Sequence, residues 1–118
     1  MSGGSEAQDF VKYAHGQLEY MLGSSGRSFV AGFGSNPPLR AHHKASSCPL
    51  APARCDWDNF NSPNPNPQIL HGALVGGPSE LNSDNIPDKR DDFKQNEVAM
   101  DYNAGFQSLL AGMLQRKC

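Results

Sequence analysis

The stretch SEAQDFVKYAHGQLEYML, residues 5–22, decides the fold class because its apolar side chains recur at helical spacing. Ser5, with Gln8 three residues later, is typical of a capping box at a helix start. Gly23 stands where a helix would end in the left-handed conformation that glycine tolerates best. These signals predict a helix over about 5–22. Its apolar stripe consists of Phe10, Ala14, Leu18, Met21 and Leu22.

A second helix is expected near the other end, over about 93–115. Asp92 and Gln95 offer another capping box, and Arg116 and Lys117 place positive charge at the helix end, where it suits the helix dipole. The expected apolar face consists of Val98, Tyr102, Phe106, Leu109 and Met113, with Leu110 and Leu114 beside it. Helices in both flanks predict an all-α fold class.

The middle of the chain is expected to contain no long helix. All nine prolines lie between Pro37 and Pro87, and proline breaks helix interiors. Only short apolar pieces, such as 28–33 and 69–75, interrupt this Pro-, Gly-, Asn- and Ser-rich region. An irregular stretch of this length is unusual inside a compact domain unless its loops line a functional cleft on a larger scaffold. The 118 residues are therefore expected to be a piece of a larger domain.

Charge and composition exclude several classes of protein. The formal net charge is −2, from 10 basic and 12 acidic residues without a run of like charge, so neither nucleic acid nor an anionic membrane is an expected partner. No apolar run is long enough to span a bilayer, and the first residues do not resemble a secretory signal peptide. Of the three cysteines, Cys48 and Cys55 form either a bridge or two free thiols, and both interpretations stay open. Cys118 would be left over.

Carboxylates gather before the second expected helix. For Asp91 and Asp92, the favourable interaction of acidic residues with a helix N-terminus is a sufficient explanation. Glu97 is expected one turn into the helix, close to the apolar stripe. A carboxylic acid beside apolar surface keeps its proton more readily and can donate it near neutral pH, so Glu97 is a candidate general acid.

The central loops hold further candidates. His42, His43, Cys48 and Cys55 could be four zinc ligands, but their spacing does not match a structural zinc site. The histidines are better interpreted as hydrogen-bonding groups for a ligand. Trp57, the single tryptophan, either stacks on a sugar ring or pins its loop to a core. The glycine-rich stretches lack the spacing of a phosphate-binding loop.

Two stretches closely resemble the signatures of family nine glycoside hydrolases. The first is YMLGSSGRSFVAGFGSNPPLRAHH, residues 20–43, and the second spans 88–106 with the motifs NEVA and DYNAGF. Between them, CDW (55–57), NSP (61–63), NP (66–67) and GALVGGP (72–78) follow the family in its order. The resemblance covers nearly the whole chain after about residue 12.

The resemblance implies a partial (α/α)6 barrel, with residues 1–118 as the C-terminal part of a catalytic domain. It implies inverting endo-hydrolysis of β-1,4-glucan without a cofactor, in a secreted parent enzyme. Glu97 falls on the family's general acid, and Asp88 and His42 on two further active-site positions of the signatures. The loop from Cys48 to Cys55 resembles the pattern of insect and mollusc members. Residues expected to contact substrate are His43, Lys44, Trp57 and Tyr102.

Departures from the family pattern bear on activity. Lys44 stands where the family usually has arginine, and Ile86 replaces a usual aromatic residue. The family's catalytic base comes from an Asp-Ala-Gly-Asp motif, which these 118 residues do not contain. The chain is therefore expected to be inactive by itself. The alternative is a non-catalytic truncated paralogue or a glucan-binding remnant.

Overall fold

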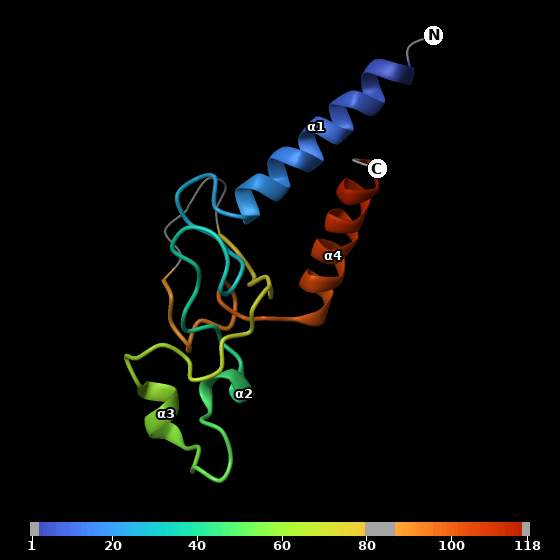
Figure 1. Ribbon diagram of the computed structural model, residues 1–118. Helices are drawn as coiled ribbons and strands as arrows, with labels where there is room; N and C mark the ends of the chain where they lie inside the picture. The colour runs from blue at the N-terminus through green and yellow to red at the C-terminus, as the bar shows by residue number, and fades with distance from the viewer. Residues whose placement is uncertain (1–2, 80–86, 117–118) are drawn as a thin grey trace.

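The computed structural model describes residues 3–79 and 87–116, so Ile86, Lys117 and Cys118 lie outside the described residues. The four helices are α1 (Gly3–Met21), α2 (Lys44–Ser47), α3 (Trp57–Asn61) and α4 (Met100–Gln115). The long helices α1 and α4 contact each other at one end of an elongated molecule, and α2 and α3 lie at the opposite end (Figure 1). The described parts of the chain contain isolated β-bridges and no strands, so the predicted all-α class is confirmed.

The first predicted helix is confirmed as α1, with small differences at its ends. Ser5 lies inside α1, which already begins at Gly3, so the capping box predicted at Ser5 is wrong. At the other end, Gly23 has a φ of 108°. The N–H of Gly23 donates to the carbonyl oxygen of Tyr20 at 3.1 Å, and the N–H of Ser24 donates to the carbonyl oxygen of Glu19 at 3.0 Å. This is the Schellman termination that the glycine predicts.

The second predicted helix begins later than expected, because α4 starts at Met100 and not near position 93. Asp92 does act as a cap, but of a local turn: its Oδ1 accepts from the N–H groups of Lys94 and Gln95, at 3.1 and 2.9 Å. Val98, predicted on the apolar face of the helix, forms a β-bridge with Val75. Contacts with distant segments therefore outweigh the helical periodicity of residues 93–99.

Four short extended segments form what we call the bridged core, residues 29–31, 41–42, 74–76 and 96–98. Its β-bridges join His42 to Glu97, Val98 to Val75 and Leu74 to Val30. Phe29, Ala41 and Val75 form the buried hydrophobic cluster, and Tyr20, Leu74 and Val98 pack against it. The bridged core therefore links the end of α1, the central loops and the segment before α4.

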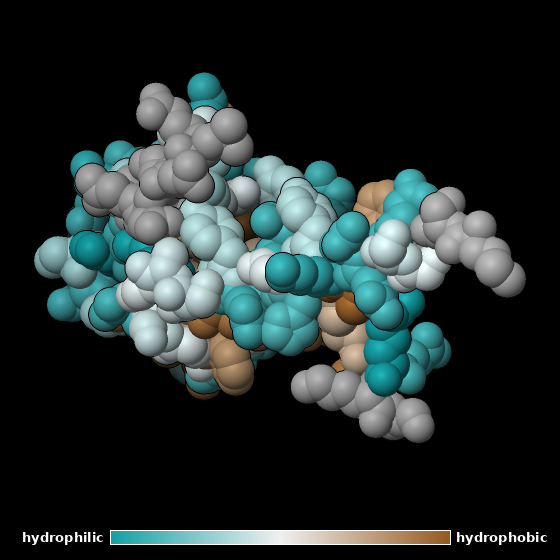
Figure 2. Space-filling view, turned by 90° about the horizontal axis from the view of Figure 1, so that it is seen from above, coloured by the Kyte–Doolittle hydropathy of each residue, from teal (hydrophilic) through white to brown (hydrophobic). Residues whose placement is uncertain are grey.

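The surface of the described residues is polar with scattered apolar groups. In the view from above, hydrophilic residues cover most of the visible surface, and hydrophobic residues show in patches between them (Figure 2). Phe10 and Tyr13 of α1 and Leu114 of α4 are exposed. No described helix is long and apolar enough to cross a membrane.

Candidate functional site

Glu97 and His42 lie side by side in the bridged core. They are paired in a parallel β-bridge, where the N–H of His42 donates to the carbonyl of Asn96 at 2.7 Å. On its other side, the carbonyl of Glu97 accepts from the N–H of Gly76 at 3.0 Å. The expectation that Glu97 lies one turn inside a helix is wrong, since it precedes α4 by three residues. Backbone hydrogen bonds on both sides instead fix the main chain at Glu97, and its side chain is half-buried.

Two adjoining hollows share His42, His43, Lys44 and Cys48 and together form what we call the cleft. The first, of about 560 Å³, also includes Glu97 and Val98. The second, of about 590 Å³, continues to Cys55, Trp57, Phe60 and Arg90. The structure therefore brings together the predicted residues Glu97, His42, His43, Lys44 and Trp57 along one depression.

The two adjacent histidines offer opposite hydrogen-bonding groups. His42 Nδ1 bonds to the carbonyl oxygen of Arg90, which can only accept, so Nδ1 carries the proton. His43 caps α2, and its Nδ1 accepts from the N–H of Ser46 at 3.2 Å. In their neutral forms, His42 Nε2 is therefore an acceptor and His43 Nε2–H is a donor. Sugar hydroxyl groups, which both donate and accept, suit such a pair.

Trp57 is the first residue of α3, where Asp56 caps the helix by accepting from the N–H of Asp58 at 3.1 Å. The indole is 74% exposed and packs edge-on against the ring of Phe60, with centroids 5.5 Å apart. Trp57 therefore does not pin its loop to a core formed by the described residues. A flat aromatic face at the edge of the cleft is suited to stacking on a ligand ring.

Cys48 and Cys55 form a disulfide, with their Cα atoms 5.2 Å apart, so of the two open interpretations the bridge is the one observed. It joins the end of α2 to the residue before the cap of α3, and both cysteines line the cleft. Since each sulfur is bonded to the other, the cysteines do not act as thiolate ligands for zinc.

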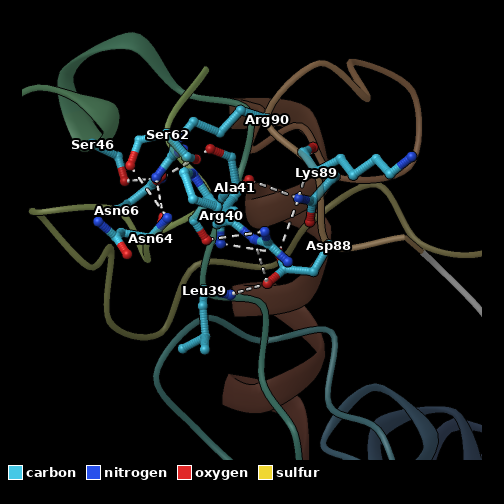
Figure 3. Close-up of polar contacts among 12 residues, drawn as sticks. Leu39, Arg40, Ala41, Ser46, Ser62, Asn64, Asn66, Asp88, Lys89 and Arg90 are labelled. Atoms are coloured by element: carbon cyan, nitrogen blue, oxygen red, sulfur yellow. Dashed lines mark hydrogen bonds and ion pairs between the residues drawn. The ribbon is translucent and has the colours of Figure 1, made fainter. Parts of the chain in front are cut away.

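The carboxylate of Asp88 is directed at the chain's own backbone (Figure 3). Its Oδ2 accepts from the N–H of Leu39 at 3.0 Å, and its Oδ1 accepts from the N–H of Arg40 at 2.9 Å. Asn96 Nδ2 donates to the same Oδ1 at 3.2 Å, and Arg40 Nε lies 3.7 Å from Oδ2. Asp88 is absent from the residues that line the two hollows of the cleft in the described structure. It joins the segment before His42 to the segment before Glu97.

Tyr102 lies on α4 and is half-buried. Among the described residues, it does not line either hollow of the cleft. The neighbouring Asn103 joins α4 to the bridged core: its Oδ1 accepts from the N–H of Leu74 at 2.8 Å, and its Nδ2 donates to the carbonyl of Leu74 at 3.0 Å. Tyr102 therefore lies in the first turn of α4, the helix that Asn103 joins to the bridged core.

Arg90 and Asn66 are central to the site but were not candidates from the sequence. Arg90 is 4% exposed, and its guanidinium donates to the carbonyl oxygens of Ser62 and Asn64 and to Asn66 Oδ1. Burial lowers the pKa of this guanidinium, the charge of Arg40 acts in the same direction and that of Asp88 opposes both. A lone arginine in a polar segment carries no periodicity, so only its position in the second signature could have indicated it.

The chain is similar to known glycoside hydrolases over most of its length. The model of glycosyl hydrolase family 9 matches residues 2–110. "Endoglucanase B" of Cellulomonas fimi is 44% identical over 102 residues, which is 84% of this chain and 9% of that protein. "Endoglucanase 3" of Arabidopsis thaliana is 41% identical over 104 residues, or 80% of this chain and 21% of that protein.

Solved structures of endoglucanases have the same arrangement. The endoglucanase of the termite Nasutitermes takasagoensis matches with a TM-score of 0.89 and 56% identity, over 98% of this chain and 26% of that one. Endoglucanase CelQ of Clostridium thermocellum, solved with cellotetraose, matches with a TM-score of 0.76 and 35% identity, over 96% of this chain and 18% of that one.

These matches cover about a quarter or less of each of these relatives. The helical architecture is that of part of an (α/α)6 barrel, as expected from the resemblance, and the likeness to the termite enzyme agrees with the insect-type pattern. The match of the family model to nearly all of the chain, together with the two endoglucanase structures, shows that this chain belongs to glycosyl hydrolase family 9.

Proposed function

We propose that the chain supplies the proton-donating part of an endo-β-1,4-glucanase active site that hydrolyses its substrate with inversion. The observation that carries the proposal is the pairing of Glu97 with His42 at a cleft whose far end presents an exposed tryptophan. Matching relatives are named endoglucanases, and CelQ was solved with cellotriose and with cellotetraose. A β-1,4-glucan is therefore the proposed substrate.

In the proposed mechanism, Glu97 acts as the general acid and protonates the glycosidic oxygen as the bond breaks. An inverting enzyme needs a second carboxylate about 6.5–9.5 Å away to activate the attacking water. Backbone hydrogen bonds on both sides of Glu97 limit its movement, which favours proton transfer in a defined geometry. His42, His43 and Lys44 bind sugar hydroxyl groups, and Trp57 stacks on a sugar ring. Tyr102 and Asp88 complete the proposed active-site set.

The catalytic base is proposed to come from a segment outside these 118 residues, because the sequence contains no Asp-Ala-Gly-Asp motif. The chain by itself is then expected to bind glucan without hydrolysing it. The disulfide between Cys48 and Cys55 is typical of proteins in oxidising compartments and supports secretion of the enzyme.

A second candidate function is glucan binding without catalysis, and the same absence of the base motif favours it. Both candidates use the cleft, so binding alone does not separate them. A measurement of hydrolysis by a completed barrel separates the two functions, because a chain that only binds glucan would give an inactive barrel.

The experiment is a chimera in which this chain replaces the matching quarter of the termite endoglucanase. We expect the chimera to hydrolyse cellulose and Glu97→Gln to lower kcat by about 1,000-fold, since general acid catalysis contributes about 10²–10⁴. Asp101→Asn, which removes an exposed carboxylate in the first turn of α4, is the matched control and should be without effect. Activity of the Glu97→Gln chimera within tenfold of its parent would exclude Glu97 as the acid.

A further inference from the structure

Residues 49–61, here called the Trp57 lobe, project from the end of the molecule opposite the two long helices (Figure 1). Within the described residues, the hydrogen bonds of the lobe are internal. Examples are the N–H of Ala53 to the carbonyl of Leu50 at 3.1 Å, and the N–H of Asp56 to Asn59 Oδ1 at 3.0 Å. The exposed Arg54 pairs with Asp56, also inside the lobe. The position of Trp57 therefore depends on how the two ends of the lobe are attached.

The first attachment is covalent. The disulfide joins Cys55, two residues before Trp57, to Cys48 at the end of α2. Because α2 begins directly after His43, this bond connects the lobe to the histidine side of the cleft. It closes the first half of the lobe, residues 49–55, and makes no contact with the chain that leaves it.

The second attachment is Arg90. Its guanidinium donates to the carbonyl oxygen of Ser62, to that of Asn64 at 2.5 Å and to Asn66 Oδ1 at 2.5 Å, all in the chain that leaves the lobe. Figure 3 shows this fork between the two segments. Asn66 Nδ2 in turn donates to the carbonyl of Ala41 at 2.9 Å and to Ser46 Oγ at 2.7 Å.

The same residue contacts His42. The backbone carbonyl of Arg90 accepts the hydrogen bond from His42 Nδ1, so one residue holds the histidine ring through its backbone and the lobe through its side chain. Among the described residues, Arg90 has no carboxylate within ion-pair distance, and its buried charge is satisfied by carbonyl and amide oxygens. A lysine carries the charge but not the planar fork that reaches three acceptors at once.

We propose that Arg90 is a positioning residue that sets the distance between the His42 side and the Trp57 side of the glucan-binding cleft, with the disulfide as the second attachment of the lobe. The inference rests on the proposed function for its ligand, a β-1,4-glucan chain that contacts both sides at once. Without the Arg90 fork the lobe keeps its disulfide, and its outgoing chain keeps the bonds from Arg40 Nη1 to the carbonyl of Pro63 at 3.1 Å and from the N–H of Asn66 to the carbonyl of Leu39 at 2.8 Å. It loses the three bonds to the guanidinium, which include the one at Ser62, directly after the lobe. The entropy of ordering the lobe is then lost on each binding event, which weakens binding.

The test uses Trp57 as its reporter, since it is the only tryptophan in the 118 residues. In the Arg90→Lys chain we expect lower fluorescence anisotropy of Trp57. We also expect a shifted or broadened NMR signal from His42 Nδ1–H, because residue 90 keeps its carbonyl but loses the guanidinium bonds that hold its backbone in position. We also expect the Kd for cellotetraose to rise about tenfold. Arg54→Lys, an equivalent change at an exposed arginine inside the lobe, should change none of these. Unchanged Trp57 anisotropy and an unchanged His42 signal in folded Arg90→Lys would overturn the proposal.

A second measurement keeps the test decisive if Arg90→Lys does not fold. Reducing the disulfide of the wild-type chain removes only the first attachment, so Trp57 anisotropy should fall part of the way towards its value in the urea-unfolded chain. The His42 signal should not change, because its partner is the carbonyl of Arg90. A fall to the unfolded value would show that Arg90 does not hold the lobe, and the proposal would be wrong.

These outcomes are separable from those of the proposed function. Trp57 anisotropy and the His42 signal are measured without sugar and report the role of Arg90 directly. If Arg90→Lys changes the Trp57 anisotropy and the His42 signal as expected but the wild-type chain does not bind cellotetraose, the glucan-binding function and the glucan part of this inference are wrong. If it binds cellotetraose equally well with and without the Arg90 fork, only the inference about Arg90 is wrong.

Discussion

The bridged core and the pair of long helices are stabilised in different ways. In the bridged core, short extended segments bury Phe29 and Val75 to 2% and 3% exposure, and Asn96 to 0%. In α1 and α4 the backbone is regular, yet Phe106 is the one buried residue assigned to α4, and Phe10 of α1 is 67% exposed. Regular secondary structure and tight packing are therefore found in different parts of the described chain.

The difference shows how irregular segments can hold a catalytic geometry. Asn96 Nδ2 donates to the carbonyl oxygen of Arg40 at 2.8 Å and to that of Lys89 at 3.1 Å, and Asp88 receives backbone N–H groups from the same region. Side chains here replace the backbone partners that a sheet would supply. The helices satisfy their own backbone groups and need tertiary contacts mainly to cover their apolar faces.

The largest expected effect is the loss of stability when phenylalanine is replaced by alanine, and it should differ between the bridged core and the long helices. Phe29→Ala should lower the free energy of unfolding by about 3–5 kcal/mol, because it removes a buried ring that packs against Tyr20 with centroids 5.2 Å apart. Phe10→Ala, on the exposed part of α1, should change it by less than about 0.5 kcal/mol. Urea unfolding followed by circular dichroism measures both. Equal losses would show that the described α1 surface is as tightly packed as the bridged core.

A smaller effect tests whether polar side chains support the bridged core. Asp88→Ala should cost about 2–3 kcal/mol, because the N–H groups of Leu39 and Arg40 lose their acceptor. Asp91→Ala, three residues later and exposed, should stay within about 0.5 kcal/mol of wild type. Thermal unfolding of the two variants under one buffer gives the comparison. A loss at Asp88 no greater than at Asp91 contradicts the supporting role of the carboxylate.

The smallest pair of effects should differ in sign between the two regions. Gly34 has a φ of 77°, and an added Cβ would lie 2.3 Å from the carbonyl oxygen of Leu22, so Gly34→Ala should cost about 1–2 kcal/mol. Gly16 lies inside α1 with nothing within 4 Å of an added Cβ, so Gly16→Ala should stabilise the helix by about 0.5–1 kcal/mol. Melting temperatures measured by circular dichroism should move in opposite directions. If Gly34→Ala raised the melting temperature, the proposed difference between the two glycines would be wrong.

Local signals in the sequence predicted local structure well. The extent of α1 and its termination at Gly23 follow from the spacing of apolar residues and from one glycine. Asp92 caps a turn as its residue type indicates. The prediction failed at 93–99, where apolar spacing indicated a helix but Val75 and His42 pair with Val98 and Glu97. Pairing partners 23 and 55 residues away leave no trace in a local pattern.

In the candidate site, too, some residues were predicted from the sequence and others were found only in the structure. His42, His43, Lys44, Trp57 and Glu97 were expected from residue chemistry and family resemblance, and the structure gathers them along one cleft. Their functional roles stay predictions until the chimera and binding experiments are done. Arg90 and Asn66 were missed, since their importance lies in contacts between segments more than 20 residues apart.

The sequence by itself determined the all-α class, the first helix, the family and the residue types available for chemistry, because these depend on local periodicity and on motifs in order along the chain. The tertiary structure alone decided that Glu97 lies in an extended segment beside His42, that Cys48 and Cys55 are joined, and that Asp88 and Arg90 face the backbone of other segments. Each of these depends on which distant segments meet, and that is set by burial of Phe29 and Val75 and by satisfaction of buried polar groups.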